Sequence, residues 1–148
     1  MMEQLTATVQ WTHKLHFEGE TEFPASVPID YPPPLSDNQG HKPMELVLMS
    51  LASCSGQTVI SLLQKMKQDV RAFSVKAVGN RKAEHPKVYT DIHLEFVVEG
   101  SNLDSESVQK AVQFSEEKYC PVWAMLKQVA NVTSAVILDP GPTQEPVS

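Results

Sequence analysis

The stretch that decides the fold runs from Met44 to Gln68 and has the sequence MELVLMSLASCSGQTVISLLQKMKQ. It has no proline and a single glycine, and it carries no charge between Glu45 and Lys65. Apolar residues occupy every side of its first half, and a helix that is apolar all round is buried on all sides. We therefore predict a central helix that begins at Pro43, a favoured first helical residue, and ends at about residue 67.

Small residues dominate the middle of this helix, from Ser50 to Gly56, so another backbone could approach it closely. Cys54, one of only two cysteines, lies in this patch. Cysteine often acts as a small buried hydrophobe, and on pattern alone that structural role is the commoner one. A reactive thiol needs a cation or a helix N-terminus to lower its pKa. Cys54 lies too far along the helix to gain much from the N-terminus, so a basic side chain would have to come from elsewhere.

Composition limits the class of protein. The 148 residues are 41% hydrophobic and 20% charged, which is typical of one globular domain. We expect that domain to cover residues 1–139, followed by a loose C-terminal tail at 140–148 that is rich in proline. The net charge of −6 argues against nucleic-acid and anionic-membrane partners, because both require a basic surface.

Hydrophobic alternation predicts strands on both sides of the helix. Residues 4–17 favour a half-buried strand that turns near 12–14 into a second one, and 18–20 favour another turn. The proline-rich segment 23–42 is predicted to be a loop with a short edge strand at 27–29. After the helix, residues 70–78 and 88–99 form a predicted hairpin. A helix at 105–118, a short helix at 121–130 and a strand at 132–138 complete an α+β domain.

The second cysteine, Cys120, is followed by Pro121, where the preceding helix must break. It lies far from Cys54 in sequence, so only folding could bring the two together, and structural cysteines remain the open alternative to a functional pair. The five histidines are scattered and no C-x-x-C spacing occurs, so we expect no metal and no cofactor. No motif supports a hydrolase, because the serine-nucleophile sequence G-x-S-x-G is absent.

Two segments carry a resemblance to a known family. They are PMELVLMSLASC, residues 43–54, and EKYCPV, residues 117–122. Together they resemble the OsmC/Ohr family, the osmotically inducible and organic-hydroperoxide-resistance proteins. In that family a first cysteine lies inside a long central helix eleven positions after a proline, as Cys54 follows Pro43 here. A second cysteine, followed by proline, comes about 65 residues later near a helix end. The PMELVLM opening looks most like a less-studied OsmC-like branch.

The resemblance implies an intertwined homodimer in which antiparallel curved sheets wrap around two central helices. The all-round apolarity of the long helix supports a dimer as well. The resemblance also implies a thiol peroxidase in which Cys54 attacks a hydroperoxide and becomes a sulfenic acid. Cys120 would then condense with it to a disulfide, which an external thiol, a lipoyl protein or a small dithiol, reduces.

The sequence departs from the family pattern around the first cysteine. Active members pair an arginine from the N-terminal region with a glutamate directly after the helix-opening proline. Here that position is Met44, Glu45 comes one place later, and no arginine precedes Arg71. The residues that could support the thiolate are therefore Glu45, Lys14, His41, Lys42 and Arg81. After Cys-Pro, the common family serine is replaced by Trp123.

The sequence therefore favours a peroxidase for organic hydroperoxides or H2O2. The alternative is a non-catalytic member of the fold that binds an apolar small molecule at the dimer interface. No basic segment followed by an apolar run opens the chain, and serine, threonine and glutamine interrupt the long helix. We accordingly expect a cytoplasmic protein with no membrane partner.

Overall fold

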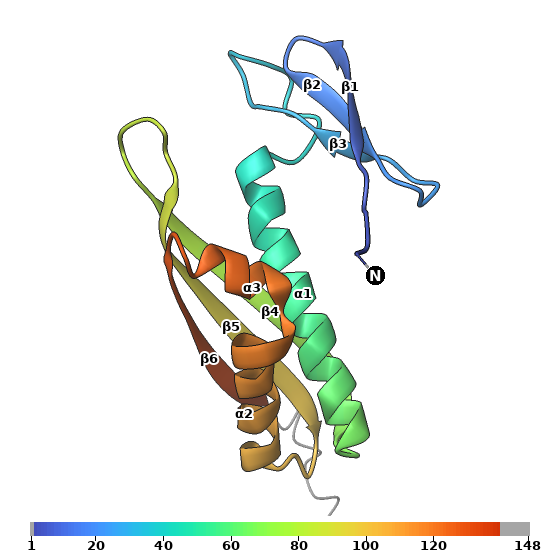
Figure 1. Cartoon of the computed structure of the whole chain (residues 1–148), viewed down its shortest axis with the longest axis vertical. Coiled ribbons are helices and arrows are strands. Elements are labelled where there is room, and N and C mark those ends of the chain that lie inside the picture. The colour runs from blue at the N-terminus through green and yellow to red at the C-terminus, as the bar shows by residue number, and fades with distance from the viewer. Residues whose placement is uncertain (1, 140–148) are drawn as a thin grey trace, which may run out of the picture. The chain divides into compact units, whose positions relative to one another are not determined.

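The computed structural model describes residues 2–139, which divide into two compact units between Val47 and Leu48. In the N-terminal unit, three strands form an antiparallel sheet in the order β1-β2-β3 (Figure 1). They are β1 (Thr8–His13), β2 (His16–Glu20) and β3 (Val27–Ile29). Lys14, with a φ of 46°, forms the turn between β1 and β2. The short strand expected at 27–29 is confirmed.

Two expectations for the N-terminal unit are wrong. The turn expected at 18–20 is absent, because Glu18 and Gly19 pair with Pro28 and Val27 and so extend β2. The strand β1 was expected to be half-buried, yet all its residues are exposed and Trp11 is 64% exposed. Its apolar face exists as the alternation predicted, but the described residues of the N-terminal unit do not cover it.

The long helix α1 extends from Pro43 to Lys65, which confirms the predicted start and places the end two residues early. Gln68 N–H donates to the carbonyl of Leu63 at 3.0 Å, and Lys67 has a φ of 57°. This combination is a Schellman motif, in which a residue in the left-handed region ends the helix and its last carbonyls are satisfied.

Burial of α1 within one chain is confined to a single stripe. Its buried residues are Leu51, Ser55, Gly56, Val59 and Leu63. Met49 is 47% exposed. Within the described residues of one chain α1 is therefore not buried on all sides as expected, because its covered stripe is the one that faces β4 and the crossover. By length and composition alone α1 could cross a membrane, but the core helix of a soluble protein meets the same criterion.

The C-terminal unit is built on a second three-stranded sheet in the order β4-β5-β6. The strands β4 (Asp69–Arg81) and β5 (Tyr89–Ser101) form the predicted antiparallel hairpin, with both strands longer than expected. The strand β6 (Asn131–Asp139) pairs with β5 in parallel, not antiparallel as expected. The reason is the connection: helices lie between β5 and β6, and such a crossover returns the chain in the same direction.

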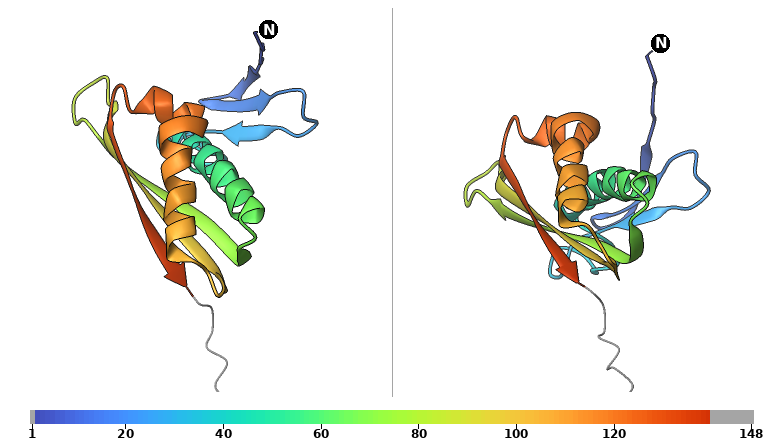
Figure 2. Two further views of the ribbon diagram at one scale, coloured as in Figure 1. Left: turned by 60° about the horizontal axis from the view of Figure 1, so that its bottom comes forward. Right: turned by 90° about the horizontal axis from the view of Figure 1, so that it is seen from below.

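The crossover contains α2 (Ser105–Phe114), the π-helix η1 (Ser115–Tyr119) and α3 (Pro121–Leu126). The single helix expected at 105–118 therefore changes to π-helical hydrogen bonding in its last turn. Figures 1 and 2 show α2 and α1 side by side on the same face of the sheet. The buried apolar residues of β5 are Ile92, Leu94, Phe96 and Val98, at alternate positions on one face of the strand.

Gly56 allows α1 to lie close to β4. A Cβ atom at this position would be 3.2 Å from Cγ2 of Val75 and 3.5 Å from Cε1 of Phe73. The predicted α+β class is confirmed. The single domain over 1–139 stays a prediction, and the tail predicted at 140–148 lies outside the described residues.

Candidate functional site

The two cysteines lie together in the C-terminal unit, and both are free thiols. Cys54 comes from α1 and is half-buried, whereas Cys120 comes from the crossover and is only 3% exposed. Their side chains are close enough to influence one another's charge. Residues that are far apart in sequence thus meet, because α1 and the crossover helices pack on the same face of the sheet.

Cys120 occupies the junction of two helices. Its N–H donates to the Ser115 carbonyl at 2.9 Å and closes the π-helical turn, and Pro121 then opens α3. As the residue that caps α3, Cys120 accepts a hydrogen bond on Sγ from the N–H of Trp123 at 3.4 Å. π-Helical turns often occur at functional sites, and here the turn ends at the thiol.

A second donor reaches Cys120 from α1. The hydroxyl of Ser55, which is fully buried, donates to Cys120 Sγ at 3.2 Å. The carbonyl of the same Ser55 accepts a hydrogen bond from the Ser115 hydroxyl at 3.3 Å. Ser55 therefore links α1 to the π-helical turn through both its side chain and its backbone.

The electrostatics of Cys54 favour the thiol over the thiolate. Burial raises the pKa of Cys54 above its ordinary value, and the neighbouring Cys120 sulfur raises it further. The N–H of Val122 opposes this rise, because it donates to the charged form. No basic side chain contributes to this balance among the described residues of the C-terminal unit.

The supporting residues that the sequence nominated have other contacts in this chain. Arg81 lies at the end of β4, and its Nε donates to the Lys87 carbonyl at 2.7 Å. Lys14 forms a 2.6 Å ion pair with Asp37 within the N-terminal unit.

The other three nominated residues surround the start of α1. The carboxylate of Glu45 accepts a hydrogen bond from the Lys42 N–H at 2.9 Å, which is the reciprocal bond of a capping box. His41 bridges to Ile29 through its backbone. These three residues thus have local structural roles in the N-terminal unit.

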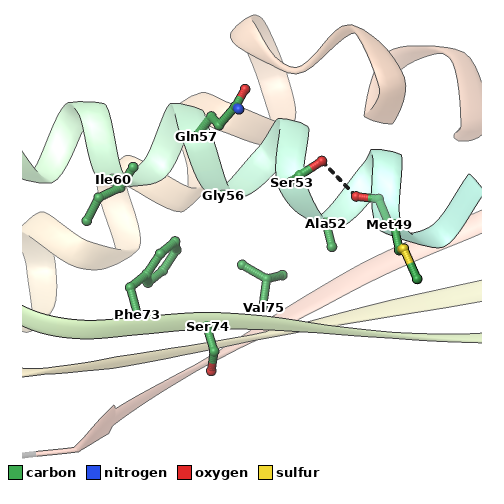
Figure 3. A pocket seen from close by; sticks show the side chains of 9 residues that line it. All are labelled: Met49, Ala52, Ser53, Gly56, Gln57, Ile60, Phe73, Ser74 and Val75. Carbon is green, nitrogen blue, oxygen red and sulfur yellow. Dashed lines mark hydrogen bonds between the residues drawn. The ribbon is translucent and has the colours of Figure 1, made fainter. Parts of the chain in front are cut away.

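A groove lies between α1 and β4 (Figure 3). Its volume is about 480 Å³, and apolar side chains form most of its lining. Phe73 and Val75 point from β4 toward the helix, while Ser74 points away. Ser53 donates its hydroxyl to the Met49 carbonyl at 2.7 Å, so it presents no free donor to the groove. Among the described residues, no group of three or more His, Cys, Asp or Glu side chains could hold a metal ion.

The sequence did not reveal the contacts of Ser55 and Ser115 beside the thiols, nor the hydrogen bond of Glu116. Ser55 belongs to the patch of small residues around Cys54 and follows that cysteine directly, but no local pattern indicates that it contacts Cys120. Glu116, in the π-helical turn, was not identified: its carboxylate accepts a short hydrogen bond from the Ser134 hydroxyl. Burial raises the pKa of Glu116, although Ser134 works against that shift. Nothing in the sequence pairs residue 116 with residue 134.

Comparison with protein-family models identifies the OsmC-like protein family over residues 36–135, a match that includes both cysteines. The chain belongs to the OsmC-like family. Protein YhfA of Escherichia coli K12 is 39% identical over 132 residues, which cover 87% of this chain and 94% of YhfA.

Solved structures share the OsmC fold with this chain. A protein from Aquifex aeolicus is 28% identical, with a TM-score of 0.80, and the match covers 93% of this chain and 99% of that protein. An organic hydroperoxide resistance protein from Elizabethkingia anophelis is 13% identical, with a TM-score of 0.69 over 94% of this chain and 99% of that one. At that identity the likeness concerns the fold alone.

Proposed function

We propose that this OsmC-like protein is a thiol-dependent peroxidase that reduces organic hydroperoxides or H2O2 in the cytoplasm. The observation that carries the proposal is the contact between two free thiols, one half-buried and one buried, at a helix junction. A structural pair of cysteines has no need for the second thiol to accept two hydrogen bonds. The name of the Elizabethkingia protein adds support from the same fold.

The proposed cycle has three balanced steps. The Cys54 thiolate attacks the O–O bond of the hydroperoxide, forms a sulfenic acid and releases an alcohol, or water from H2O2, after protonation. Cys120 sulfur then attacks the sulfenic sulfur, the S–O bond breaks, and water leaves with the Cys120 proton. An external dithiol finally reduces the disulfide and is itself oxidised to a disulfide. A lipoyl protein or a small dithiol has the chemistry for that last step.

The cycle requires a thiolate at Cys54, and the environment of this residue in one chain disfavours it. A cation within about 4–6 Å would reverse that balance. We propose that a second copy of the chain brings one, with Lys14, His41, Lys42 and Arg81 as the candidates.

A homodimer would also cover the apolar surface of α1 that one chain leaves half-exposed. Sedimentation at micromolar concentration tests whether the protein is a homodimer, and a stable monomer would contradict the proposed dimer.

Thiol counting tests the peroxidase directly. One equivalent of cumene hydroperoxide should convert the two thiols of the reduced protein into one Cys54–Cys120 disulfide, seen as a loss of two hydrogens by mass spectrometry. One equivalent of cumyl alcohol, the product that lacks the peroxide function, is the matched control. It should leave both thiols free.

The same experiment addresses the alternative, a non-catalytic protein that holds an apolar molecule at the dimer interface. The groove between α1 and β4 is the feature that favours it. If both thiols survive minutes of peroxide treatment, while cumyl alcohol protects the protein against thermal unfolding, the binding function is supported and the peroxidase is not.

A further inference from the structure

The hydrogen bond of Ser55 differs from those of the other hydroxyl residues around Cys54. Serine and threonine inside helices commonly donate to a carbonyl one turn earlier. Ser53 does so toward Met49, and Thr58 does so toward Cys54. Ser55 donates to the sulfur of Cys120 instead, from a side chain that is fully buried.

Sulfur in a neutral thiol is a weak acceptor. A buried hydroxyl with a carbonyl one turn away therefore gains little by choosing it. A sulfur that carries negative charge is a much better acceptor, because a hydrogen bond to an ionised group is roughly twice as strong as a neutral one. The contact is thus most valuable in those steps of a reaction in which Cys120 is charged.

We propose that Ser55 is a positioning residue for Cys120, and that its hydroxyl orients this sulfur and stabilises the charge on it. The proposal rests on the thiol-peroxidase function. In disulfide formation the S–H bond of Cys120 breaks, the S–S bond forms, and the sulfenic oxygen of Cys54 leaves as water. Ser55 O–H stabilises the sulfur as it loses its proton, and Trp123 N–H is the second donor.

The same hydrogen bond favours Cys120 as the sulfur that leaves when the disulfide is reduced. Cys54 is the more accessible sulfur, so the thiolate of the reductant attacks it and forms a mixed disulfide. In the same step Cys120 leaves with the electron pair of the broken S–S bond, and it takes up a proton later. Two donors that already point at Cys120 make it the better leaving group.

Substitution of Ser55 tests the proposal in the full-length reduced protein. In Ser55→Ala, formation of the Cys54 sulfenic acid, trapped with dimedone, should stay within about twofold of the wild type. Disulfide formation should slow roughly tenfold or more, as expected for loss of a hydrogen bond to a charged group. The curve of the rate of disulfide formation against pH should also move to higher pH in Ser55→Ala. A rate loss without a pH shift, or an unchanged rate of disulfide formation, would overturn the proposal.

Two further variants separate this role from packing. Ser115→Ala deletes the same atom from another fully buried serine, whose hydroxyl donates to the backbone carbonyl of Ser55, and it should change stability without moving the pH profile. Ser55→Thr keeps the hydroxyl and should restore much of the rate of disulfide formation. If both serine variants shift the pH profile equally, Ser55 has no special role.

A measurement on the wild type remains decisive even if Ser55→Ala does not fold. The oxidised protein, exposed briefly to 2-mercaptoethanol and then alkylated, should carry the mixed disulfide on Cys54 and the alkyl group on Cys120. An adduct mainly on Cys120 would overturn the proposal. These outcomes differ from failure of the peroxidase itself, in which the wild type traps no sulfenic acid and forms no disulfide with peroxide.

Discussion

The Nδ1 atom of His16 lies 3.3 Å from the Oδ2 atom of Asp30, and both side chains are buried. The other ring nitrogen, Nε2, lies 2.9 Å from a carboxylate oxygen of Glu18. An imidazole with a carboxylate at each nitrogen is favoured in its charged form, in which both nitrogens donate. The bond to Glu18 raises the pKa of His16, burial opposes the rise, and Asp30 adds to it.

The two carboxyl groups respond in the opposite direction. Burial alone would raise the pKa of Asp30, but hydrogen bonds from Ser36, from the N–H groups of Gln39 and Tyr31, and from His16 together hold it well below its usual value. The bond to His16 lowers the pKa of Glu18. The stabilisation from these carboxylates is present above about pH 4 and is lost as the pH falls through their lowered pKa values.

His16 therefore contributes a stabilisation that is lost on the alkaline side. Its contribution is complete below about pH 6.5 and is lost as the pH rises through its raised pKa. We predict that the urea midpoint falls between pH 6 and pH 8, and that His16→Gln lowers the midpoint at pH 6 and flattens this dependence. His85→Gln, a change at an exposed histidine, should keep the wild-type slope. An equal slope in His16→Gln would show that another group titrates.

The thiol of Cys54 gives a second pH prediction. Because burial and Cys120 raise the pKa of Cys54, alkylation of this residue by iodoacetamide should keep accelerating above pH 9 in a single chain. Cys120→Ser should shift the profile to lower pH, since it removes one cause of the rise. An inflection near or below neutral pH in the wild type would instead reveal a cation beside Cys54. Substitution of Lys14, His41, Lys42 or Arg81 by glutamine, one at a time, would then identify that cation by the loss of the inflection.

Periodicity sufficed to predict most of the fold. No proline interrupts the helix after Pro43, and the hairpin strands alternate over most of their length, so local signals and tertiary packing agree. The parallel pairing of β6 with β5 could not be predicted from alternation, which is the same in both pairings. The exposure of Trp11 and Met49 could not be predicted either, because a pattern indicates an apolar face without showing what covers it.

The candidate site divides along similar lines. Cys54 and Cys120 stood out as the only two cysteines, and family resemblance paired them. Ser55, by contrast, acquires its contact with Cys120 only through the packing of α1 against the π-helical turn. His16 and Asp30 lie together because β2 pairs with the three-residue strand β3, and alternation in so short a strand does not specify which residues face each other. Residues whose partners are distant in sequence thus escaped prediction.

Glu45 gives a prediction that separates a capping role from a catalytic one. The carboxylate that accepts the Lys42 N–H satisfies one of the unpaired donors at the start of α1. Glu45→Ala should therefore reduce the free energy of unfolding by on the order of 0.5–1 kcal/mol. Glu45→Gln, which keeps an acceptor oxygen, should retain most of it. If Glu45→Gln folds as stably as the wild type yet loses peroxide reduction, the carboxylate charge acts on the thiol and the cap is secondary.

The two cysteines should divide the chemistry between them. Cys54 is half-buried and Cys120 is 3% exposed, so peroxide reaches the first thiol far more readily. Cys54→Ser should therefore abolish peroxide consumption. Cys120→Ser should react once and leave a sulfenic acid at Cys54, which excess peroxide oxidises further because no thiol resolves it. Peptide mass spectrometry distinguishes the two: oxygen that adds to Cys120 in Cys54→Ser as fast as to Cys54 in Cys120→Ser would reverse or abolish the assignment.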